Sequence, residues 1–331
     1  MSAPPPAERP ASDSGLRAAP PPRPQRPPPL DDPRFVYPPP STDYADLPAM
    51  LGHPDLGPLV LGWLGDDTRA ASALRGTCAA ARDAVGAHPW ADLKTCIVWP
   101  ARWRRAFPRA VAACVRGNAR LVDADFVHLR GLRSLDMRWC SQAGITDGAF
   151  AHLAGIHTLR MSGCRQATIT DAAFAHLAGI HTLHMSGCRQ ATITDGAFAH
   201  LAGIHTLRMS GCRQATITDG AFTHLAGIHT LHMSLCRQAG ITDGAFAHLT
   251  GIHTLHMSGC YQATITDGAF AYLAGIHTLH MSLCRQAGIT DGAFAHLAGI
   301  HTLDMSLCSQ VTISAACRTR LRQAGIHDLR M

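Results

Sequence analysis

The chain has 331 residues, a formal net charge of +6 at pH 7 and 47% hydrophobic residues. This apolar content excludes a chain that is disordered throughout, because it is enough to form a sizeable core. The N-terminal residues show no apolar segment behind a basic start, and no run approaches the roughly 18 apolar residues of a membrane-spanning helix. We therefore expect a soluble protein of the cytoplasm or nucleus with no membrane partner, whose 12 cysteines are free thiols.

The N-terminal segment is rich in proline. Sixteen of the 21 prolines lie between Met1 and Pro48, in runs such as APPPAERP and RPQRPPPL. Proline rings fix φ and lack an N–H donor, so this composition favours polyproline II and prevents a packed core. The sequence predicts a disordered tail over residues 1–45. We interpret it as a solvated spacer, and the alternative is that PPPRPQRPPP binds a proline-recognising domain.

Residues 46–90 change to Leu, Ala and Gly with helical spacing, which predicts a small helical module. Asp66 and Asp67 can cap a helix over TRAASALRGTCAAARDAV. That stretch carries an apolar stripe at i, i+4 and i+8 spacing. Ahead of it, Gly57 and Pro58 are expected to break or delay a helix in HPDLGPLVLGWL. The stripe consists of Ala70, Leu74, Cys78, Ala81 and Val85.

This module resembles the F-box, whose pattern is Leu-Pro, an acidic residue, a run of Leu or Ile, an acidic turn and a closing Val-Cys-Arg-x-Trp. Here LPAM at Leu47 or HPDL at His53 matches the start, residues 64–67 match the turn and Cys78 matches the family cysteine. No acidic residue follows Leu47-Pro48 directly, and Ala81 stands where the family has Trp.

The F-box resemblance implies a docking site for a Skp-type adaptor and, through it, a cullin. The residues that would form this site are Pro54, Leu56, Leu59, Leu61, Leu64, Leu74 and Cys78.

Residues 91–120 are expected to form a linker or N-terminal cap. They include CIVWPARWRRAFPRAV, in which Trp99, Trp103 and Phe107 alternate with arginines. Such a segment could bind nucleic acid by stacking and phosphate pairing. We favour amphipathic packing with solvated arginines, because aromatic side chains are strongly core-seeking.

Residues 121–331 consist of about eight copies of one 24-residue unit, with a degenerate last copy. In each copy the apolar positions read I-x-x-L-x-M-x-x-C followed by I-T-D-x-x-F-x-x-L. The alternation of Leu159 and Met161 predicts a strand. Phe174 and Leu177 predict a short helix that begins after a Thr-Asp cap and ends at Gly179. One copy cannot hide its apolar side chains, so neighbouring copies must stack and pair their strands in a parallel sheet.

The repeat resembles the leucine-rich repeat, specifically its cysteine-containing subtype, whose I/L-T-D-x-x-L/F-x-x-L segment appears here as ITDGAFAHL. The resemblance implies an α/β solenoid, a horseshoe with a parallel concave sheet and short convex helices. The helical F-box-like module and the proline-rich tail precede it. The four residues between Cys164 and Ile169 form a longer gap than is usual in the family, so the conformation of this loop stays open.

The repeated cysteines and histidines do not predict a metal site, a cofactor or a catalytic centre. Structural zinc needs four convergent ligands, whereas each repeated thiol lies in its own copy, in the slot that the family turns inward. The histidines at His157 and His152 and their counterparts are expected to form solvated stripes. Ser, His and Asp likewise recur as parallel series, so we expect a protein without enzymatic activity. The cysteine series is Cys140, Cys164, Cys188, Cys212, Cys236, Cys260, Cys284 and Cys308.

One position varies more than the others in chemical character, namely the residue between the strand Leu and Met. Because side chains alternate along a strand, this residue is expected to face outward on the concave sheet, where leucine-rich repeats bind partners. Arginines just beyond the strands add positive charge, which favours an acidic partner over nucleic acid. Neutral drift on a solvated face is the alternative. This concave row consists of Asp136, Arg160, His184, Arg208, His232, His256, His280 and Asp304.

Together, the two resemblances imply a substrate-recruiting F-box/leucine-rich-repeat subunit of a Skp/cullin/F-box ubiquitin ligase. In that role the module binds the adaptor and the repeats bind the protein to be ubiquitinated. Two alternatives stay open, a leucine-rich-repeat interaction scaffold without a ligase link and, less favoured, a nucleic-acid-binding protein.

Overall fold

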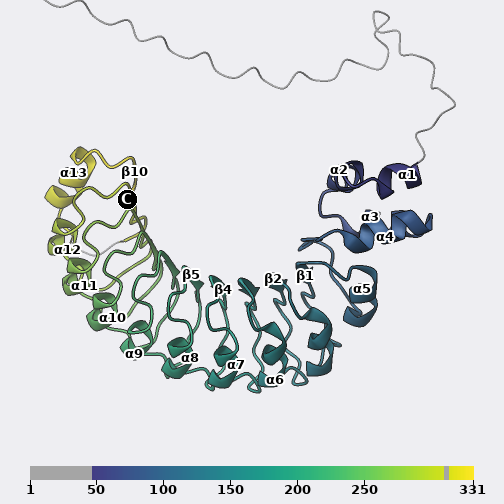
Figure 1. The fold of residues 1–331 in the computed structure, drawn as a ribbon. Coiled ribbons are helices and arrows are strands. Elements are labelled where there is room, and N and C mark those ends of the chain that lie inside the picture. The colour runs from purple at the N-terminus through teal and green to yellow at the C-terminus, as the bar shows by residue number, and fades with distance from the viewer. Residues whose placement is uncertain (1–46, 309–312) are drawn as a thin grey trace, which may run out of the picture. The chain divides into compact units, whose positions relative to one another are not determined.

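The computed structural model describes residues 47–308 and 313–331. The proline-rich tail predicted over residues 1–45 lies outside these residues. The described part of the chain contains a group of N-terminal helices followed by a ten-stranded sheet with short helices between its strands (Figure 1). None of the helices in residues 47–308 and 313–331 has the length and apolar character needed to span a bilayer.

All ten strands are parallel and follow chain order from β1 to β10. Equivalent residues of successive copies lie side by side, as Leu159 and Leu183 do between β3 and β4. The 24-residue period of the sequence therefore becomes the strand-to-strand step of the sheet. The strands are β1 (Ala112–Cys114), β2 (Ser134–Asp136), β3 (Thr158–Arg160), β4 (Thr182–His184), β5 (Thr206–Arg208), β6 (Thr230–His232), β7 (Thr254–His256), β8 (Thr278–His280), β9 (Thr302–Asp304) and β10 (Asp328–Arg330).

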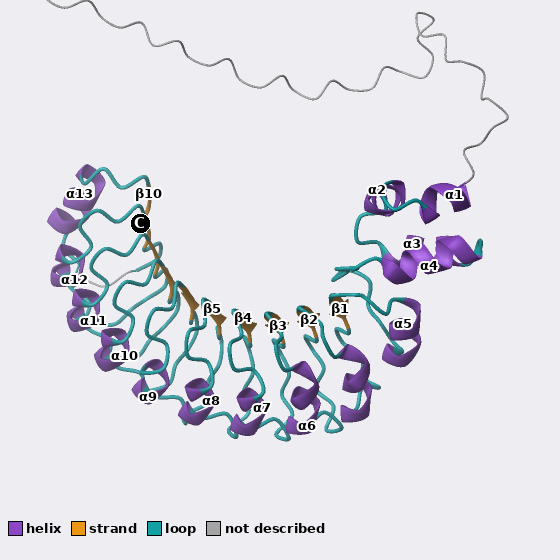
Figure 2. Ribbon diagram, in the orientation of Figure 1, coloured by secondary structure: helices purple, strands orange, loops and turns teal. Residues whose placement is uncertain are grey.

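Short helices cover the outer side of the repeats, while the strands line the inner, concave side (Figure 2). Each α-helix from α6 to α12 starts after a threonine whose hydroxyl accepts a hydrogen bond from a backbone N–H of the first turn, as Thr170 does from Ala172. The helices are η1 (Asp123–Leu129), α6 (Asp147–Phe150), η2 (Ala151–Leu153), α7 (Asp171–Ala175), α8 (Asp195–Ala199), α9 (Asp219–Phe222), α10 (Asp243–Ala247), α11 (Asp267–Ala271), α12 (Asp291–Ala295) and α13 (Ala315–Gln323).

The core is one continuous column of the repeated apolar side chains. Leu159, Met161 and Cys164 are completely buried, and so are Ile169 and Phe174. The predicted strand, loop and helix in each copy, and the inward orientation of the cysteines, are therefore confirmed. A fully buried phenylalanine in such a site contributes about 3–5 kcal/mol relative to alanine.

Hydrogen bonds from one copy to the next accompany this packing. The carboxylate of Asp171 accepts from the backbone N–H of Thr194 at 2.7 Å and from its hydroxyl at 2.5 Å. The same threonine hydroxyl accepts from Gly196 N–H, so it joins the helix start of one copy to the aspartate of the preceding copy. Equivalent bonds run from Asp123–Thr146 to Asp291–Ser314.

The loop between Cys164 and Ile169, whose conformation the sequence did not predict, and its counterparts each bury a glutamine. The exposed fractions of these side chains are 3–6%. At the first position of the series, Gln142 donates to the carbonyl oxygens of Asn118 and Leu121. The buried members are Gln166, Gln190, Gln214, Gln238, Gln262 and Gln286.

The helical module has four helices where the sequence predicted a single helix in its second half. They are α1 (Leu47–Gly52), α2 (Leu56–Trp63), α3 (Thr68–Arg75) and α4 (Ala79–Ala87). Asp67 caps α3 as predicted, with hydrogen bonds from Arg69 and Ala70 N–H. The prediction of one helix over residues 68–85 is wrong. Helix α3 ends at Arg75 with Gly76 as its C-cap, and the Cys78 sulfur accepts a hydrogen bond from Ala81 N–H at the start of α4.

The expectation that Gly57 and Pro58 delay a helix is also wrong. Helix α2 begins at Leu56 and includes both residues in its first turn, where proline loses no helical hydrogen bond. A Cβ at Gly57 would lie 2.5 Å from the carbonyl oxygen of Leu51, so glycine is what allows α1 and α2 to approach closely.

The segment over residues 91–120 contains α5 (Pro100–Ala106) and the first strand of the sheet, β1. Trp103 and Phe107 are buried, which confirms the packing interpretation for these two aromatic residues. The guanidinium of Arg104 donates to the carbonyl oxygens of His128, Ala110 and Arg130 at 2.7–3.0 Å. This arginine therefore attaches α5 to the first copy.

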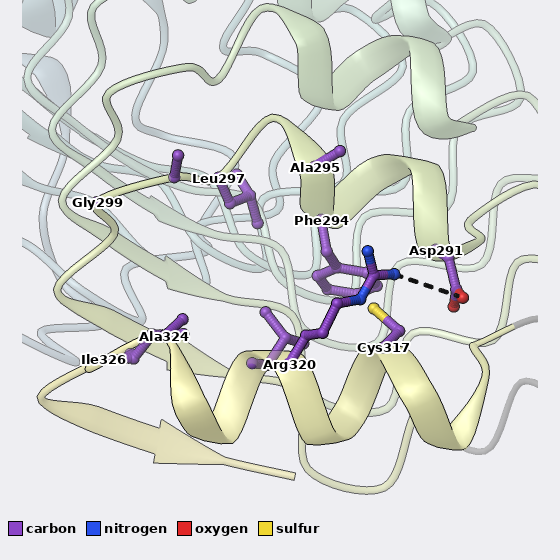
Figure 3. A pocket seen from close by; sticks show the side chains of 11 residues that line it. Asp291, Phe294, Ala295, Leu297, Gly299, Cys317, Arg320, Ala324 and Ile326 are labelled. Carbon is purple, nitrogen blue, oxygen red and sulfur yellow. Dashed lines mark ion pairs between the residues drawn. The ribbon is translucent and has the colours of Figure 1, made fainter.

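The last copy closes the array with a longer helix, α13, followed by β10. A small cavity of about 170 Å³ lies between α12 and α13, and Arg320 reaches across it to Asp291 at 4.0 Å (Figure 3). Phe294 is 7% exposed here, whereas its counterparts in earlier copies are completely buried. The altered sequence of the last copy therefore gives a looser contact.

Candidate functional site

The eight residues of the concave row lie in one line across β2 to β9. In the register of the parallel strands, each member lies beside its counterpart in the next strand: Asp136 beside Arg160, Arg208 beside His232, and His280 beside Asp304. Arg208 is exposed, and the other members apart from Asp136 are half-buried. The sheet thus presents on one face the side chains that differ between copies.

Asp136 differs from the expectation of an outward-facing, exposed side chain. Its exposed fraction is 0%, because Arg138 covers it with two hydrogen bonds, from Nε to Oδ1 at 2.9 Å and from a terminal nitrogen to Oδ2 at 2.6 Å. These bonds lower the pKa of the Asp136 carboxyl, although burial opposes them. The negative charge of Asp136, the first member of the row, is therefore neutralised by Arg138.

Three histidines in the middle of the row carry depressed pKa values. Burial, reinforced by the charges of Arg208 and Arg160, lowers the pKa of His184 to about 4. Burial and neighbouring side chains likewise lower the pKa of His232 and of His256 to about 4. These imidazoles are neutral at pH 7, so the positive charge of the row comes from its arginines.

The neighbouring imidazoles of the row stack on one another. The ring centroids of His232 and His256 lie 4.0 Å apart, and those of His256 and His280 lie 4.3 Å apart. His280 Nδ1 lies 3.6 Å from Asp304 Oδ2, which ends the stack at a carboxylate. The stacked rings therefore occupy each other's faces, and the stack ends beside the carboxylate of Asp304.

Just beyond the strands lies a second line of positive charge, here named the arginine row. Its members are exposed, and none has an ion-pair partner within residues 47–308 and 313–331. Arg237 lies over the ring of Tyr261, 4.6 Å from its centroid. Uncompensated guanidinium groups on one side of the concave face favour contact with negative charge. The row consists of Arg165, Arg189, Arg213, Arg237 and Arg285.

Histidines that precede the strands, which the sequence analysis predicted as a solvated stripe, form a ladder of stacked rings; the stacking itself was not predicted. Successive rings lie 4.4–4.5 Å apart from His157 to His327. Desolvation and the adjacent imidazoles lower the pKa of His181 and of His229. The signal was present in the sequence, because identical residues one period apart must stack in a parallel register. The ladder consists of His157, His181, His205, His229, His253, His277, His301 and His327.

The second histidine series lies at the ends of the outer helices. His176, His200 and His248 are the C-cap residues of α7, α8 and α10. At His152 the Nδ1 atom accepts a hydrogen bond from Arg130 Nε at 3.0 Å. These histidines lie on the opposite side of the repeats from the concave row.

The repeated cysteines donate hydrogen bonds inside the core, as Cys164 does to the carbonyl oxygen of Met137 at 3.3 Å. Burial raises the pKa of Cys140 to about 11 and that of Cys212 to about 12. Among the described residues, no group of three or more His, Cys, Asp or Glu side chains is placed to hold a metal ion.

The residues singled out in the F-box-like module divide into an exposed and a buried set. Pro54, Leu56 and Leu59 are exposed, and Leu61 is buried. The other three, Leu64, Leu74 and Cys78, are half-buried against the core. The sequence analysis missed Trp63, which is 93% exposed at the end of α2.

No protein-family model matches the sequence, and no curated protein matches it. Solved structures do match the fold. The TLR13 chain of a TLR13–ssRNA13 complex is 19% identical with a TM-score of 0.51, and the match covers 62% of this chain and 29% of that chain. Human 5T4 (Wnt-activated inhibitory factor 1, trophoblast glycoprotein) is 16% identical with a TM-score of 0.51, and the match covers 70% of this chain and 88% of that chain.

The match spans under a third of the TLR13 chain, and sequence identities this low show similarity of fold alone. Together with the parallel sheet and the alternating short helices, they show that the described repeats adopt the leucine-rich-repeat solenoid that the sequence predicted.

Proposed function

We propose that this chain is a non-catalytic protein-interaction protein whose concave row and arginine row bind an acidic segment of a partner protein. The observation that carries the proposal is the contrast between an unvarying core and a charged concave face. Arg208 is exposed in the middle of that face, and five further arginines beside it have no ion-pair partner among the described residues. Complementary charge attracts and orients an acidic partner.

An acidic polypeptide fits this surface better than nucleic acid does. Single-stranded nucleic acid is gripped by aromatic platforms on which bases stack, and the concave row has no Trp, Tyr or Phe. Its own imidazoles already stack on one another at 4.0–4.3 Å, so they leave no space for a base between them. Asp304 at one end of the row would repel phosphates, whereas Asp136 at the other end is buried and paired with Arg138.

The concave site can be tested with fluorescently labelled poly-L-glutamate and the full-length chain in an anisotropy titration. We expect Arg160→Glu combined with Arg208→Glu to weaken binding about tenfold or more, because two attractive charges become repulsive. Arg322→Glu on α13 is the matched control and should leave the affinity close to that of the wild type. Equal affinity of all three proteins, or no binding by the wild type, would reject the site.

A labelled single-stranded DNA probe tests the nucleic-acid alternative in the same assay. A DNA affinity that exceeds the poly-L-glutamate affinity and falls steeply with salt would favour nucleic acid as the partner. Weak binding of DNA supports the proposal.

We further propose, from the F-box resemblance, that the N-terminal module docks a Skp-type adaptor of a cullin ubiquitin ligase. Leu56, Leu59 and Trp63 leave an apolar face of α2 exposed, at 41%, 64% and 93%. Beside it, an apolar cavity of about 750 Å³ is lined by residues that include Leu51, Pro54 and Leu61. An exposed apolar helix face with an adjacent groove suits a helical partner.

Adaptor docking can be tested by a pull-down with a purified Skp-type adaptor. The full-length chain should retain the adaptor, whereas Leu56→Glu combined with Leu59→Glu should not, because charge would enter an apolar contact. Val127→Glu changes an exposed apolar residue of η1 and serves as the control. Equal recovery with all variants contradicts the assignment. No recovery by the wild type leaves an interaction scaffold without a ligase link as the better description.

A further inference from the structure

Two cysteines outside the repeated series lie next to each other at the first strand of the sheet. The Sγ atoms of Cys96 and Cys114 are 3.4 Å apart. The two residues are opposite each other in a parallel β-bridge, and Ile97 N–H donates to the Cys114 carbonyl oxygen at 2.7 Å. Neighbouring strands are about 4.8 Å apart, which is within the Cα separation that a disulfide bond requires.

The other cysteines are arranged differently. All 12 cysteines of the chain are free thiols, and no other pair of sulfur atoms lies within hydrogen-bonding distance among the described residues. From Cys140 to Cys308, each repeated thiol donates to a backbone carbonyl oxygen inside the core. The pair at Cys96 and Cys114 thus combines proximity with exposure of one partner, because Cys96 is exposed and Cys114 is buried.

The exposed member of the pair lines an open cavity of about 460 Å³. Arg69 and Arg102 line the same cavity from α3 and α5, and Trp99 adds an aromatic wall. Neither arginine has an ion-pair partner within residues 47–308 and 313–331. A cavity of this size accommodates a small peptide, and its two guanidinium groups can meet carboxylates.

The two thiols also differ in their readiness to react with a small disulfide. Burial is the main cause that raises the pKa of Cys114 to about 11, and the neighbouring Cys96 contributes. The thiolate is the nucleophile in disulfide exchange, so an oxidant from solvent reacts first at the accessible Cys96.

We propose that Cys96 and Cys114 form a thiol–disulfide exchange site for a low-molecular-weight, carboxylate-bearing disulfide of the glutathione class, which docks against Arg69 and Arg102. The Cys96 thiolate attacks one sulfur of the disulfide, forms a mixed disulfide and releases one thiolate. Cys114, passing its proton to the thiolate that was released first, attacks the Cys96 sulfur and releases the second thiolate, which takes up a proton from solvent. The two protein thiols are oxidised to one disulfide, and the small disulfide is reduced to two thiols.

The new bond would fix the edge of the sheet. Ile97 lies beside β1 on the side away from β2, where it occupies the hydrogen-bonding edge of the first strand. Asn118 Nδ2 holds the same segment through the carbonyl oxygens of Ile97 and Val98. Oxidation would therefore join the segment around Ile97 covalently to β1, and reduction would leave this segment held by hydrogen bonds.

The test uses the reduced full-length chain, glutathione disulfide and intact-mass measurement with peptide mapping. We expect the wild type to lose two hydrogen atoms, retain no glutathione and link Cys96 to Cys114. Cys114→Ser should stop at a mixed disulfide on residue 96, and Cys96→Ser should not react. Cys78→Ser is the control and should behave like the wild type. If the wild-type product keeps glutathione, or if its disulfide involves another cysteine, the proposed exchange site at Cys96 and Cys114 is wrong.

The choice of disulfide class is tested by comparing glutathione disulfide with the cationic disulfide cystamine. We expect Arg69→Ala combined with Arg102→Ala to slow the reaction with glutathione disulfide several-fold and to leave or raise the rate with cystamine. The same effect of the variant on both reagents contradicts recognition of carboxylates. A rise of a few degrees in Tm on oxidation of the wild type, absent in Cys96→Ser, supports attachment of the Ile97 segment to β1, and an unchanged Tm contradicts it.

Discussion

Inside the repeat array the same side chains recur from copy to copy, whereas the concave row takes three residue types in eight copies. Phe174, Phe198 and Phe222 are all completely buried. Arg208, one position from a buried leucine, is exposed. Neighbouring copies pack against each other through the interior, so a change inside one copy must be accommodated by two others. The concave position has no such constraint and can change with the partner.

The largest effect should come from truncating the interior. We expect Phe198→Ala to lower the free energy of unfolding by about 3–5 kcal/mol, because a cavity opens between α7, α8 and α9. Urea unfolding monitored by circular dichroism measures it. Leu235→Ala is the control: this side chain is 44% exposed, so we expect a loss under about 1 kcal/mol. Similar losses in both variants would contradict the distinction between interior and surface.

An intermediate effect is expected for the hydrogen bonds that join successive copies. Asp195→Ala removes the acceptor of Thr218 N–H, at 2.7 Å, and of its hydroxyl. We expect a loss of about 1–3 kcal/mol in the free energy of unfolding, because partly buried donors lose their partner. Asp195→Asn keeps one acceptor oxygen and should lose less. Equal losses for both variants would show that the negative charge matters more than the hydrogen bonds.

Acid should destabilise the protein through the concave histidines. The pKa of His232 and of His256 is about 4 in the folded protein, below the ordinary value of 6.5. The unfolded chain therefore binds more protons between these values, so stability is full above about pH 6.5 and falls as the pH drops towards 4. Solvent screening of these half-buried groups reduces the total to about 1–2 kcal/mol.

The variant His232→Gln with His256→Gln tests this dependence. We expect its free energy of unfolding to fall less than that of the wild type between pH 7 and pH 4.5, measured by urea denaturation. Parallel losses in the two proteins would exclude these histidines as the source.

The sequence could predict the fold because each copy contains its own strand, cap and helix signals, and the period predicts their register. The positions of Leu159, Phe174 and the concave row follow directly from this pattern. The sequence could not predict features that depend on long-range contacts. The break between α3 and α4 occurs between Gly76 and Cys78, where the apolar stripe continues without interruption. The approach of Cys96 to Cys114 depends on how the segment around Ile97 pairs with β1.

The exposed fraction of side chains in the concave row could not be predicted from the local sequence either. Strand alternation places Asp136 on the concave side, but its exposure depends on Arg138, which folds back over it. The same holds for the loop glutamines, which are polar in sequence and buried in the array. Alternation predicts the side of the sheet, whereas neighbouring side chains determine the exposed fraction.

The smallest effect on stability is expected for a substitution in the concave row, at the exposed residue Arg208. Arg208→Ser should change the free energy of unfolding by no more than about 0.5 kcal/mol, because the side chain is exposed and makes no ion pair with a described residue. Its charge nevertheless helps to lower the pKa of His184 and of His232. The substitution should therefore raise both pKa values, which imidazole NMR shifts can follow through a pH titration. Unchanged or lower pKa values would mean that the charge of Arg208 does not help to keep these rings neutral, and a large loss of stability would mean that the concave row supports the fold as the interior does.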